Sequence, residues 1–449
     1  MSASEARELL TLSAPMTGTA LVNMGMSITD TVMMGWIGPA ALAAGAVVSD
    51  LYSIVYYFMA GVLSASAALI AQALGAGRGA EARRVLRQGF FAAALLTIPA
   101  FFLVWNATFL LRVFGVEETV IELGSGYGRM MAVTVVPMMF VAVWRNAFAA
   151  LGRPKVFLVA TLVALPVNGC ANAVFMFGMG PVPAMGLAGA GLASAIVATG
   201  LAMGFVAFAL INADMRQLRL FQRWWRFDKR HLTEIFRVGT PIGFSSIGEV
   251  GVYLLSTVII SLFGTTALAA HAIALRMAGL VYALTLGLSQ AATVRVGYAV
   301  GRGDSRGTAE SAWTALVVGT VFGVVIFAVL AGTADSMPWL FLEEGPAGTA
   351  AVASTAAGLL FLLGALNVAV GPASSAMAIL RGFKDTRVPM VLCLTAKWAI
   401  GMPIAYLAGF HLGWSADGVW TGLAVAEAAM AILMCDRLFR RGMEPQIPR

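Results

Sequence analysis

Apolar runs of membrane-spanning length follow one another through almost the whole chain, and no other feature constrains the fold as strongly. Short polar segments separate these runs, which lie at residues 12–37, 46–74, 89–111, 128–151, 156–178, 187–211, 236–262, 272–300, 312–334, 351–380, 389–410 and 418–435. A helix needs about 20 mostly apolar residues to cross the hydrocarbon core of a bilayer. Only 11% of the 449 residues are charged, whereas soluble domains average roughly 25%. We therefore predict an all-α membrane protein of about twelve transmembrane helices.

The charged residues between the runs predict the orientation of these helices. Basic residues gather in every second loop, at residues 78–87, 153–155, 216–237, 302–306, 381–387 and 437–441. The other loops hold Arg112 and Arg129 but mostly acidic residues, namely Glu117, Glu118, Glu122, Glu343, Glu344 and Asp417. Lys and Arg mark cytoplasmic loops. We therefore expect both termini in the cytoplasm, and the net charge of +7 needs no nucleic-acid partner.

The two halves of the chain repeat each other. The segment GPAALAAGA at residues 38–46 aligns with GTTALAAHA at residues 264–272, and the following spans align at the same shift. Each half holds an even number of spans, so both insert the same way up. We predict two parallel six-helix lobes, residues 1–212 and 236–449, related by a pseudo-two-fold axis along the membrane normal. A basic cytoplasmic linker, residues 213–235, joins them; it is either an interfacial helix or only a solvated orientation signal.

Ionisable groups inside spans are costly and mark pathways for ions or substrates. Asp30 lies within the first span. Asn168 and Asn172 lie four apart in the fifth span and so share one helix face. One carboxylate and two amide oxygens suit a proton or a small hard cation such as sodium. Hydrogen bonding between helices is the alternative role for the asparagines.

The second half carries Glu249 in the seventh span and Lys397 in the eleventh. A buried carboxylate needs a proton, a metal ion or a positive side chain beside it. We predict an ion pair between Glu249 and Lys397, with snorkelling of the lysine to the headgroups as the alternative. His271, at the end of a loop, is expected to be structural.

Motifs of catalysis are missing from the sequence. It holds no GxxxxGK[ST], HExxH or GxSxG pattern, and Cys170, Cys393 and Cys435 are not in CxxC spacing. We expect neither an enzyme nor a cofactor.

Several longer motifs resemble the multidrug and toxic compound extrusion (MATE) family, in particular its bacterial NorM-like branch. They are SITDTVMMG, GTPIGFSSIGE, TALAAHAIALRMAG, LSQAATVRVG, LRGFKDT and IGMPIAY. The resemblance implies a monomeric transporter of the bacterial cytoplasmic membrane that exports diverse, often cationic and amphiphilic compounds. It implies alternating access between two lobes, coupled to entry of protons or sodium.

The resemblance also assigns site residues. Asp30 matches the family's essential first-span aspartate, Asn168 and Asn172 match its cation-site positions in the first lobe, and Glu249 matches an acid of the seventh span. One departure concerns the tenth span, where Val370 replaces an aspartate and Asn367 stands where glutamine is frequent. The second-lobe polar site, Glu249, Asn367 and Lys397, therefore lacks one oxygen ligand for sodium.

Two other functions compete with efflux. A lipid or lipid-linked-glycan flippase of the same architecture would be expected to have a cationic central cavity. A membrane sensor or scaffold would be expected to carry an added soluble domain.

Overall fold

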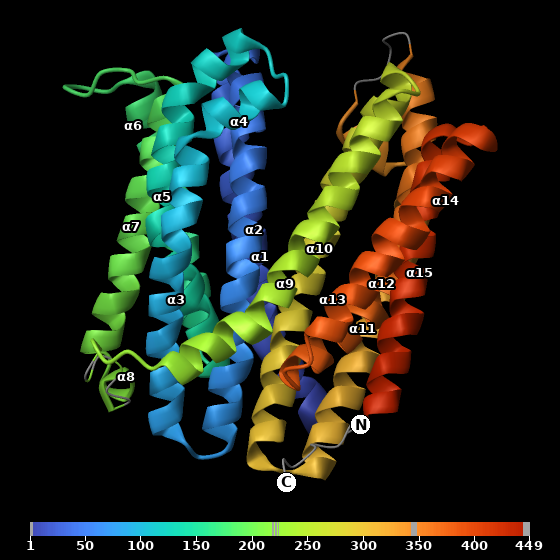
Figure 1. Ribbon diagram of the computed structural model, residues 1–449. Coiled ribbons are helices and arrows are strands. Elements are labelled where there is room, and N and C mark those ends of the chain that lie inside the picture. Colours follow the sequence, from blue (N-terminus) through green and yellow to red (C-terminus); the bar gives the residue numbers. More distant parts are fainter. Residues whose placement is uncertain (1–2, 218–219, 221, 223, 343–347, 443–449) are drawn as a thin grey trace. The chain divides into compact units, whose positions relative to one another are not determined.

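The computed structural model describes residues 3–217, 220, 222, 224–342 and 348–442 of the chain, and these are helical almost throughout (Figure 1). Among them, the β-structure consists of one bridge between Met179 and Val182. The loop charges Arg219, Arg223, Glu343 and Glu344 lie outside the described residues. The all-α prediction is confirmed.

Each predicted apolar run corresponds to one long helical stretch. They are α1 (Ala3–Ile37), α2 (Pro39–Gly75), α3 (Gly79–Trp105), α5 (Glu118–Ala150), α6 (Pro154–Phe177), α7 (Leu187–Ile211), α9 (Lys229–Ser261), α10 (Thr265–Arg302), α11 (Ser305–Thr333), α12 (Thr349–Gly382), the stretch Arg387–His411, and α15 (Ser415–Arg441). Within the described residues, eleven of these are long and apolar enough to cross a membrane. The exception is α1, which carries polar side chains along its apolar part, among them Thr17, Asn23 and Asp30.

The stretch Arg387–His411 changes its helical type along its length. It begins as α13 (Arg387–Leu394), widens into the π-helix η2 (Thr395–Gly401), returns to α14 (Met402–Tyr406) and ends in the π-helix η3 (Leu407–His411). Shorter helices elsewhere are α4 (Ala107–Val113), η1 (Met337–Leu340) and α8 (Ala213–Gln217). Within the described part of the predicted basic linker, the helices are α8 and the start of α9 at Lys229, and residues 220, 222 and 224–228 lie outside helices.

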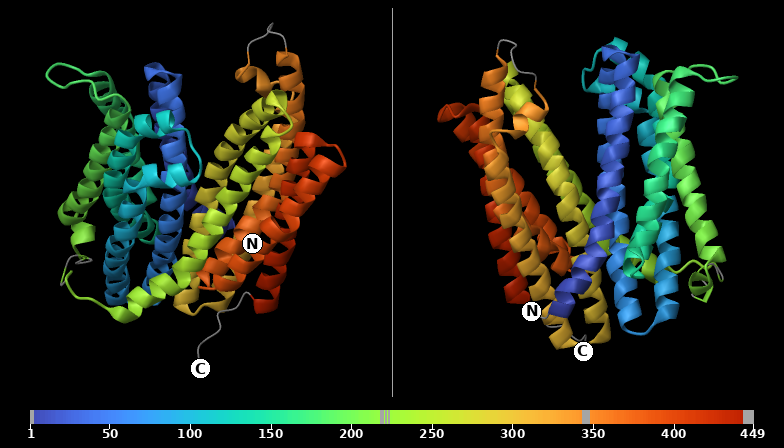
Figure 2. Two further views of the ribbon diagram at one scale, coloured as in Figure 1. Left: turned by 45° about the horizontal axis from the view of Figure 1, so that its top comes forward. Right: turned by 180° about the vertical axis from the view of Figure 1, so that it is seen from behind.

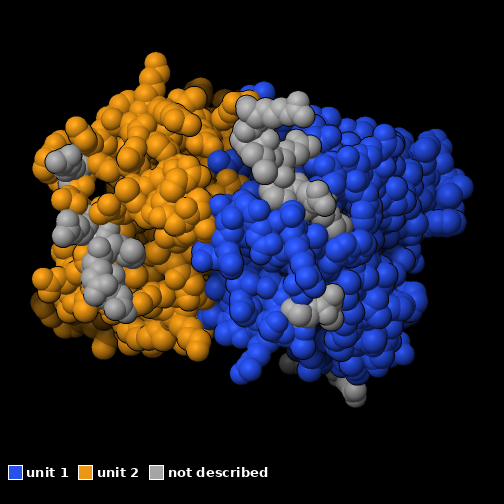
Figure 3. Space-filling model, turned by 90° about the horizontal axis from the view of Figure 1, so that it is seen from below, with its two compact units in different colours: residues 1–17, 244–449 blue, residues 18–243 orange. Residues whose placement is uncertain are grey.

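The chain divides into two compact units, coloured separately in Figure 3. We call residues 18–243 the first unit, which is orange and labelled unit 2 in Figure 3, and residues 1–17 with 244–449 the second unit, which is blue and labelled unit 1 there. Within each unit the long helices run side by side (Figure 2). The functional lobe boundaries at 1–212 and 236–449 stay a prediction.

The core of the first unit is built around α5, which packs against α2, α3 and α7. Trp144 and Phe148 of this helix are fully buried and stack on each other. Phe148 also contacts Phe205 of α7, which stacks on Phe157 of α6. Burying aromatic rings of this size is among the largest apolar contributions a helix pair can make. These rings therefore hold α6 in place relative to the rest of the unit.

The second unit is centred on α12, which packs against α10, α11 and α15. Small residues bring the backbones together. A Cβ added at Gly371 would lie 2.2 Å from the carbonyl oxygen of Gly319, and one at Gly422 would lie 2.4 Å from Cα of Ala405. Membrane helices use such residues because close approach increases van der Waals contact where lipid offers no hydrophobic driving force. The second contact presses α14 onto α15.

The first residues of α1 belong to the second unit. Arg295 of α10 pairs with Glu8 at 2.5 Å and with Glu5 at 2.5 Å, and Ser311 of α11 donates to Glu5 at 2.7 Å. Further along α1, the Thr17 hydroxyl donates to the Leu284 carbonyl at 3.4 Å. The single helix α1 thus starts in one unit and carries Asp30 in the other.

Candidate functional site

Asp30, Asn168 and Asn172 come together in the first unit. The Asn172 side chain donates from Nδ2 to Oδ1 of Asp30 at 2.5 Å, and the same nitrogen lies 3.4 Å from Oδ1 of Asn168. Both asparagines are buried, at 3% and 0% exposure. They project together from α6 because they are one helical turn apart. Pro166, just before them, lacks the amide that would continue the backbone ladder.

The carbonyl oxygen of Asn172 is the unusual atom of this group. It is buried and has no hydrogen-bond partner among the described residues. A buried polar atom without a partner costs about 1–3 kcal/mol. A proton on Asp30, or a small cation between these side chains, would give that oxygen a partner once the amide turns. The donor set of one carboxylate and two amides fits a hard cation or a proton. Clusters of three or more His, Cys, Asp and Glu side chains that could hold a metal are not found among the described residues.

Lys397 lies between two carboxylates in the second unit. Its ammonium donates a hydrogen bond to Oε1 of Glu427 on α15 and lies 3.4 Å from Oε1 of Glu249 on α9. The side chains of Lys397 and Glu427 are 3% and 7% exposed, whereas that of Glu249 is 25% exposed. The structure thus shows the predicted ion pair of Lys397 with Glu249. The ammonium does not snorkel along its helix, because both carboxylates hold it inside the unit.

The π-helix η2 positions Lys397. A π-turn contains more residues than an α-turn and so changes the direction of the side chains that it carries, and such turns are frequent at functional sites. On one side, Trp398 donates from Nε1 to the Gly248 carbonyl at 3.1 Å, next to Glu249. On the other side, a Cβ at Gly401 would lie 2.4 Å from Cβ of Ala426, next to Glu427. The eleventh span is therefore held between the two helices that supply the carboxylates.

Sequence reasoning did not predict Glu427. It lies in AVAEAAM, within the apolar run of the twelfth span, so the rule that selected Glu249 would also have selected it. Asn367 is buried, but its amide donates to the Leu363 carbonyl of its own helix at 2.7 Å. Among the described residues it is not bonded to Glu249 or Lys397, and its place in the polar site stays a prediction. Val370 packs against the apolar core of the second unit.

His271 is fully buried and both of its ring nitrogens are used. Trp420 donates from Nε1 to Nδ1 at 3.0 Å, and Nε2 lies 2.9 Å from the Thr257 hydroxyl. These contacts agree with the structural role expected for this histidine.

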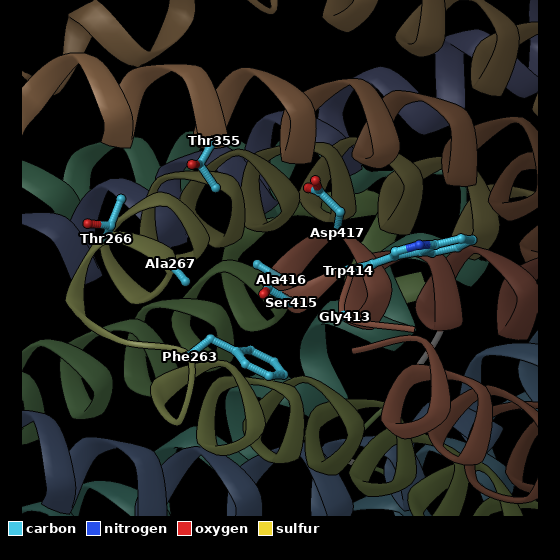
Figure 4. Close-up of a pocket in the computed structure, with 9 residues that line it drawn as sticks. All are labelled: Phe263, Thr266, Ala267, Thr355, Gly413, Trp414, Ser415, Ala416 and Asp417. Carbon is cyan, nitrogen blue, oxygen red and sulfur yellow. The ribbon is translucent and has the colours of Figure 1, made fainter. Parts of the chain in front are cut away.

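A separate pocket of about 580 Å³ lies near the ends of helices α9, α10, α12 and α15 in the second unit (Figure 4). Its lining residues are Phe263, Thr266, Ala267, Thr355, Gly413, Trp414, Ser415, Ala416 and Asp417. Asp417 is its one acidic group, and none of the predicted site residues lines it.

Comparisons with known proteins agree with this architecture. The chain is 35% identical to a protein of Mesorhizobium japonicum named "Probable multidrug resistance protein NorM" over 97% of this chain and 94% of that one. A protein of the same name from Agrobacterium fabrum is 32% identical over 97% of this chain and 93% of that protein.

Among solved structures, the eukaryotic MATE transporter AtDTX14 has a TM-score of 0.86 at 18% identity, covering 98% of this chain and 96% of that one. A MOP superfamily transporter from Pyrococcus furiosus has a TM-score of 0.87 at 18% identity, covering 97% of this chain and 96% of that one. Both likenesses support the two-lobe fold. The family described as MatE matches residues 15–174 and 241–407, which is most of the chain. The chain therefore belongs to the MatE family, in its NorM-like branch.

Proposed function

We propose that the protein is a secondary antiporter of the bacterial cytoplasmic membrane that exports cationic, amphiphilic compounds by alternating access. Entry of protons or sodium ions at Asp30 drives the export. The observation that supports this most is the Asp30, Asn168 and Asn172 group, with its buried and unpartnered carbonyl oxygen. Family membership and the relatives' names support the same conclusion.

The coupling role follows from the bond between α1 and α6. Ionised Asp30 accepts a hydrogen bond from the Asn172 amide, as in this structure. When Asp30 binds a proton or a cation, its carboxylate no longer attracts the amide nitrogen of Asn172. The carbonyl oxygen of Asn172 can then contact the bound proton or cation instead. An ion can drive a conformational change only if it interacts differently with the two states. Here the contact that changes links two helices, so ion binding would alter how α1 packs.

The charges inside the spans favour cationic cargo over an anionic lipid headgroup. The three acids Asp30, Glu249 and Glu427 outnumber the single lysine Lys397 in the two polar groups. An excess of carboxylates in the spans attracts organic cations and repels phosphates. Efflux therefore explains the site better than flipping of phospholipids or lipid-linked glycans. We also propose that the protein acts as a monomer with both termini in the cytoplasm.

The test is ethidium accumulation by everted membrane vesicles, energised with a proton gradient or with a sodium gradient. Hydrogen bonds to charged groups contribute about 1.5–3 kcal/mol, which corresponds to about tenfold to hundredfold in rate. Asp30→Asn should lower the initial rate by that factor while insertion stays normal. Asp436→Asn is the matched control, because Asp436 is an exposed carboxylate paired with Arg440. Wild-type rates in Asp30→Asn vesicles would refute the proposed coupling role, and the gradient that drives the wild type identifies the ion.

A further inference from the structure

The second unit contains its own buried cation. Lys397 touches Glu427 and lies 3.4 Å from Glu249, so the positive charge is supplied by the chain. We infer that Lys397 is a tethered cation that takes the place of a bound metal ion in this unit. Glu427 anchors the ammonium permanently, and Glu249 is the partner that the ammonium can release to an organic monocation. The release step rests on the proposed function, whereas the tethered cation does not.

The two carboxylates differ in the way this inference requires. Glu427 is hydrogen-bonded to the ammonium and its side chain is 7% exposed. Glu249 is farther away and its side chain is 25% exposed. The contact of Lys397 with Glu427 is shorter and more buried, so it is harder to break, because a buried charge that loses its partner is left without solvation. An incoming cation would therefore displace the ammonium from Glu249 and leave the Glu427 contact in place.

The charges of the group give Glu249 its affinity for a cation. One lysine contacts the two glutamates, so this group of three side chains carries one excess negative charge, with which the more distant guanidinium of Arg381 on α12 also interacts. That charge belongs on Glu249, because Glu427 holds the ammonium more closely. A soft or bulky organic cation needs only this one exposed carboxylate and does not have to enter the buried pair.

A metal ion does not fit this group. Its ligands would be Glu249 and Glu427, and the ammonium already lies within ion-pair distance of both. A metal ion between the same oxygens would stand next to a positive charge at contact distance. Val370 adds no oxygen ligand and packs into the apolar core. The described residues show no cluster of three metal-binding side chains here.

The experiment measures the thermal unfolding of purified full-length variants in detergent. All variants carry Asp30→Asn, so that the first unit contributes no response to cations. Each is heated in choline chloride, in sodium chloride and in n-propylammonium chloride of equal ionic strength. Propylammonium is the probe because it has the same three carbons and ammonium that Lys397→Ala removes. Lys155→Ala is the matched control, since Lys155 is an exposed lysine at the start of α6.

We expect Lys397→Ala to unfold roughly 5 °C or more lower in choline chloride. Propylammonium or sodium should recover a large part of this shift in a saturable way, whereas the parent protein and Lys155→Ala should shift much less, because their own ammonium already occupies the Glu427 contact. The double variant Lys397→Met with Glu427→Gln should regain stability without any added cation, since neither charge is then stranded. An unshifted Lys397→Ala would overturn the inference. So would a shift that no cation reduces, or a double variant as unstable as Lys397→Ala.

The release step has a separate readout in ethidium binding, followed by fluorescence anisotropy. Lys397→Ala should bind ethidium about tenfold more tightly than its parent, because Glu249 has lost its competitor. Glu249→Gln should bind it about tenfold more weakly. Unchanged or weaker binding to Lys397→Ala would contradict the release step. Neither assay involves transport, so their failure would leave the coupling role of Asp30 untouched, and failure of ethidium export would leave the tethered cation standing.

Discussion

His271 shows how a single polar side chain is accommodated in the apolar interior of the second unit. Trp420 donates to Nδ1, so that nitrogen carries no proton and the neutral ring keeps its proton on Nε2. Nε2 then donates to the Thr257 hydroxyl, which in turn donates to the Tyr253 carbonyl at 3.0 Å. Every donor in this series has an acceptor. The network therefore needs neither a charge nor a water molecule to be stable.

Removing Trp420, the first donor of this network, gives a prediction for a single side chain. Trp420→Phe keeps one aromatic ring but strands Nδ1 of His271; a buried acceptor left unpaired costs about 1–3 kcal/mol, and the missing second ring of this fully buried side chain adds a loss of packing. We expect chemical denaturation to show a loss of at least this size, with an unchanged rate of ethidium export per folded molecule. Trp313→Phe is the control, because Trp313 is 46% exposed on α11. Slower export from a variant of normal stability would mean that the network belongs to the transport path.

The polar residues also show how far sequence reasoning reaches at this scale. Helical spacing was sufficient to place Asn168 and Asn172 on one face, and the first-span acid was the natural partner. Lys397 was assigned to Glu249, whereas the closer contact is with Glu427. The two glutamates lie on different helices. Their distances from the Lys397 ammonium depend on how α9 and α15 pack against the eleventh span. Periodicity along one helix contains no information about that packing.

At the scale of elements, the apolar pattern predicted the helices well and their internal geometry poorly. The run 187–211 coincides with α7, while α9 begins at Lys229, before the apolar run at 236. The π-turns of the eleventh span were not predicted. The backbone of η2 lies close to α15 at Gly401 and is bonded to α9 through Trp398. Such contacts are made by tertiary packing, and the sequence of one span does not reveal them.

The start of α1 gives a prediction for an element. Arg295 is the cation that joins α10 to Glu5 and Glu8, and all three side chains keep some exposure. Hydrogen bonds to charged groups contribute more than neutral ones, but exposure reduces this to about 1 kcal/mol. We expect Arg295→Ala to speed hydrogen exchange of the amides in residues 3–14 by about fivefold, as measured by mass spectrometry.

The comparison for this measurement is Arg302→Ala, an exposed arginine in the last turn of the same helix. Its exchange in residues 3–14 should match the wild type. Equal exchange in Arg295→Ala and in the wild type would show that apolar contacts alone hold this segment in the second unit.

For the whole molecule, the fold and the orientation rest on different evidence. The helices and the two-lobe fold follow from apolar runs, and they agree with solved structures of the family. A helical bundle has the same internal contacts whichever way it is inserted, so these contacts do not decide its orientation. The distribution of Lys and Arg between alternate loops predicts it, because translocation of short basic loops is disfavoured.

The last prediction tests that orientation at Gln222, which is exposed in the basic segment between α8 and α9. In a background where Cys170 and Cys435 are replaced by Ser, and Cys393 is left because it is buried, we introduce Gln222→Cys. A membrane-impermeant maleimide should label it in everted vesicles or permeabilised cells and leave it unlabelled in intact cells. Glu117→Cys, in an acidic loop of the opposite set, should be labelled in intact cells and stay unlabelled in sealed everted vesicles. Because basic residues surround position 222, moving it outside would require several cations to cross the bilayer, each at a cost of about 2.5–3.5 kcal/mol at the helix centre. Labelling of Gln222→Cys in intact cells would reverse the assigned topology and place both termini outside.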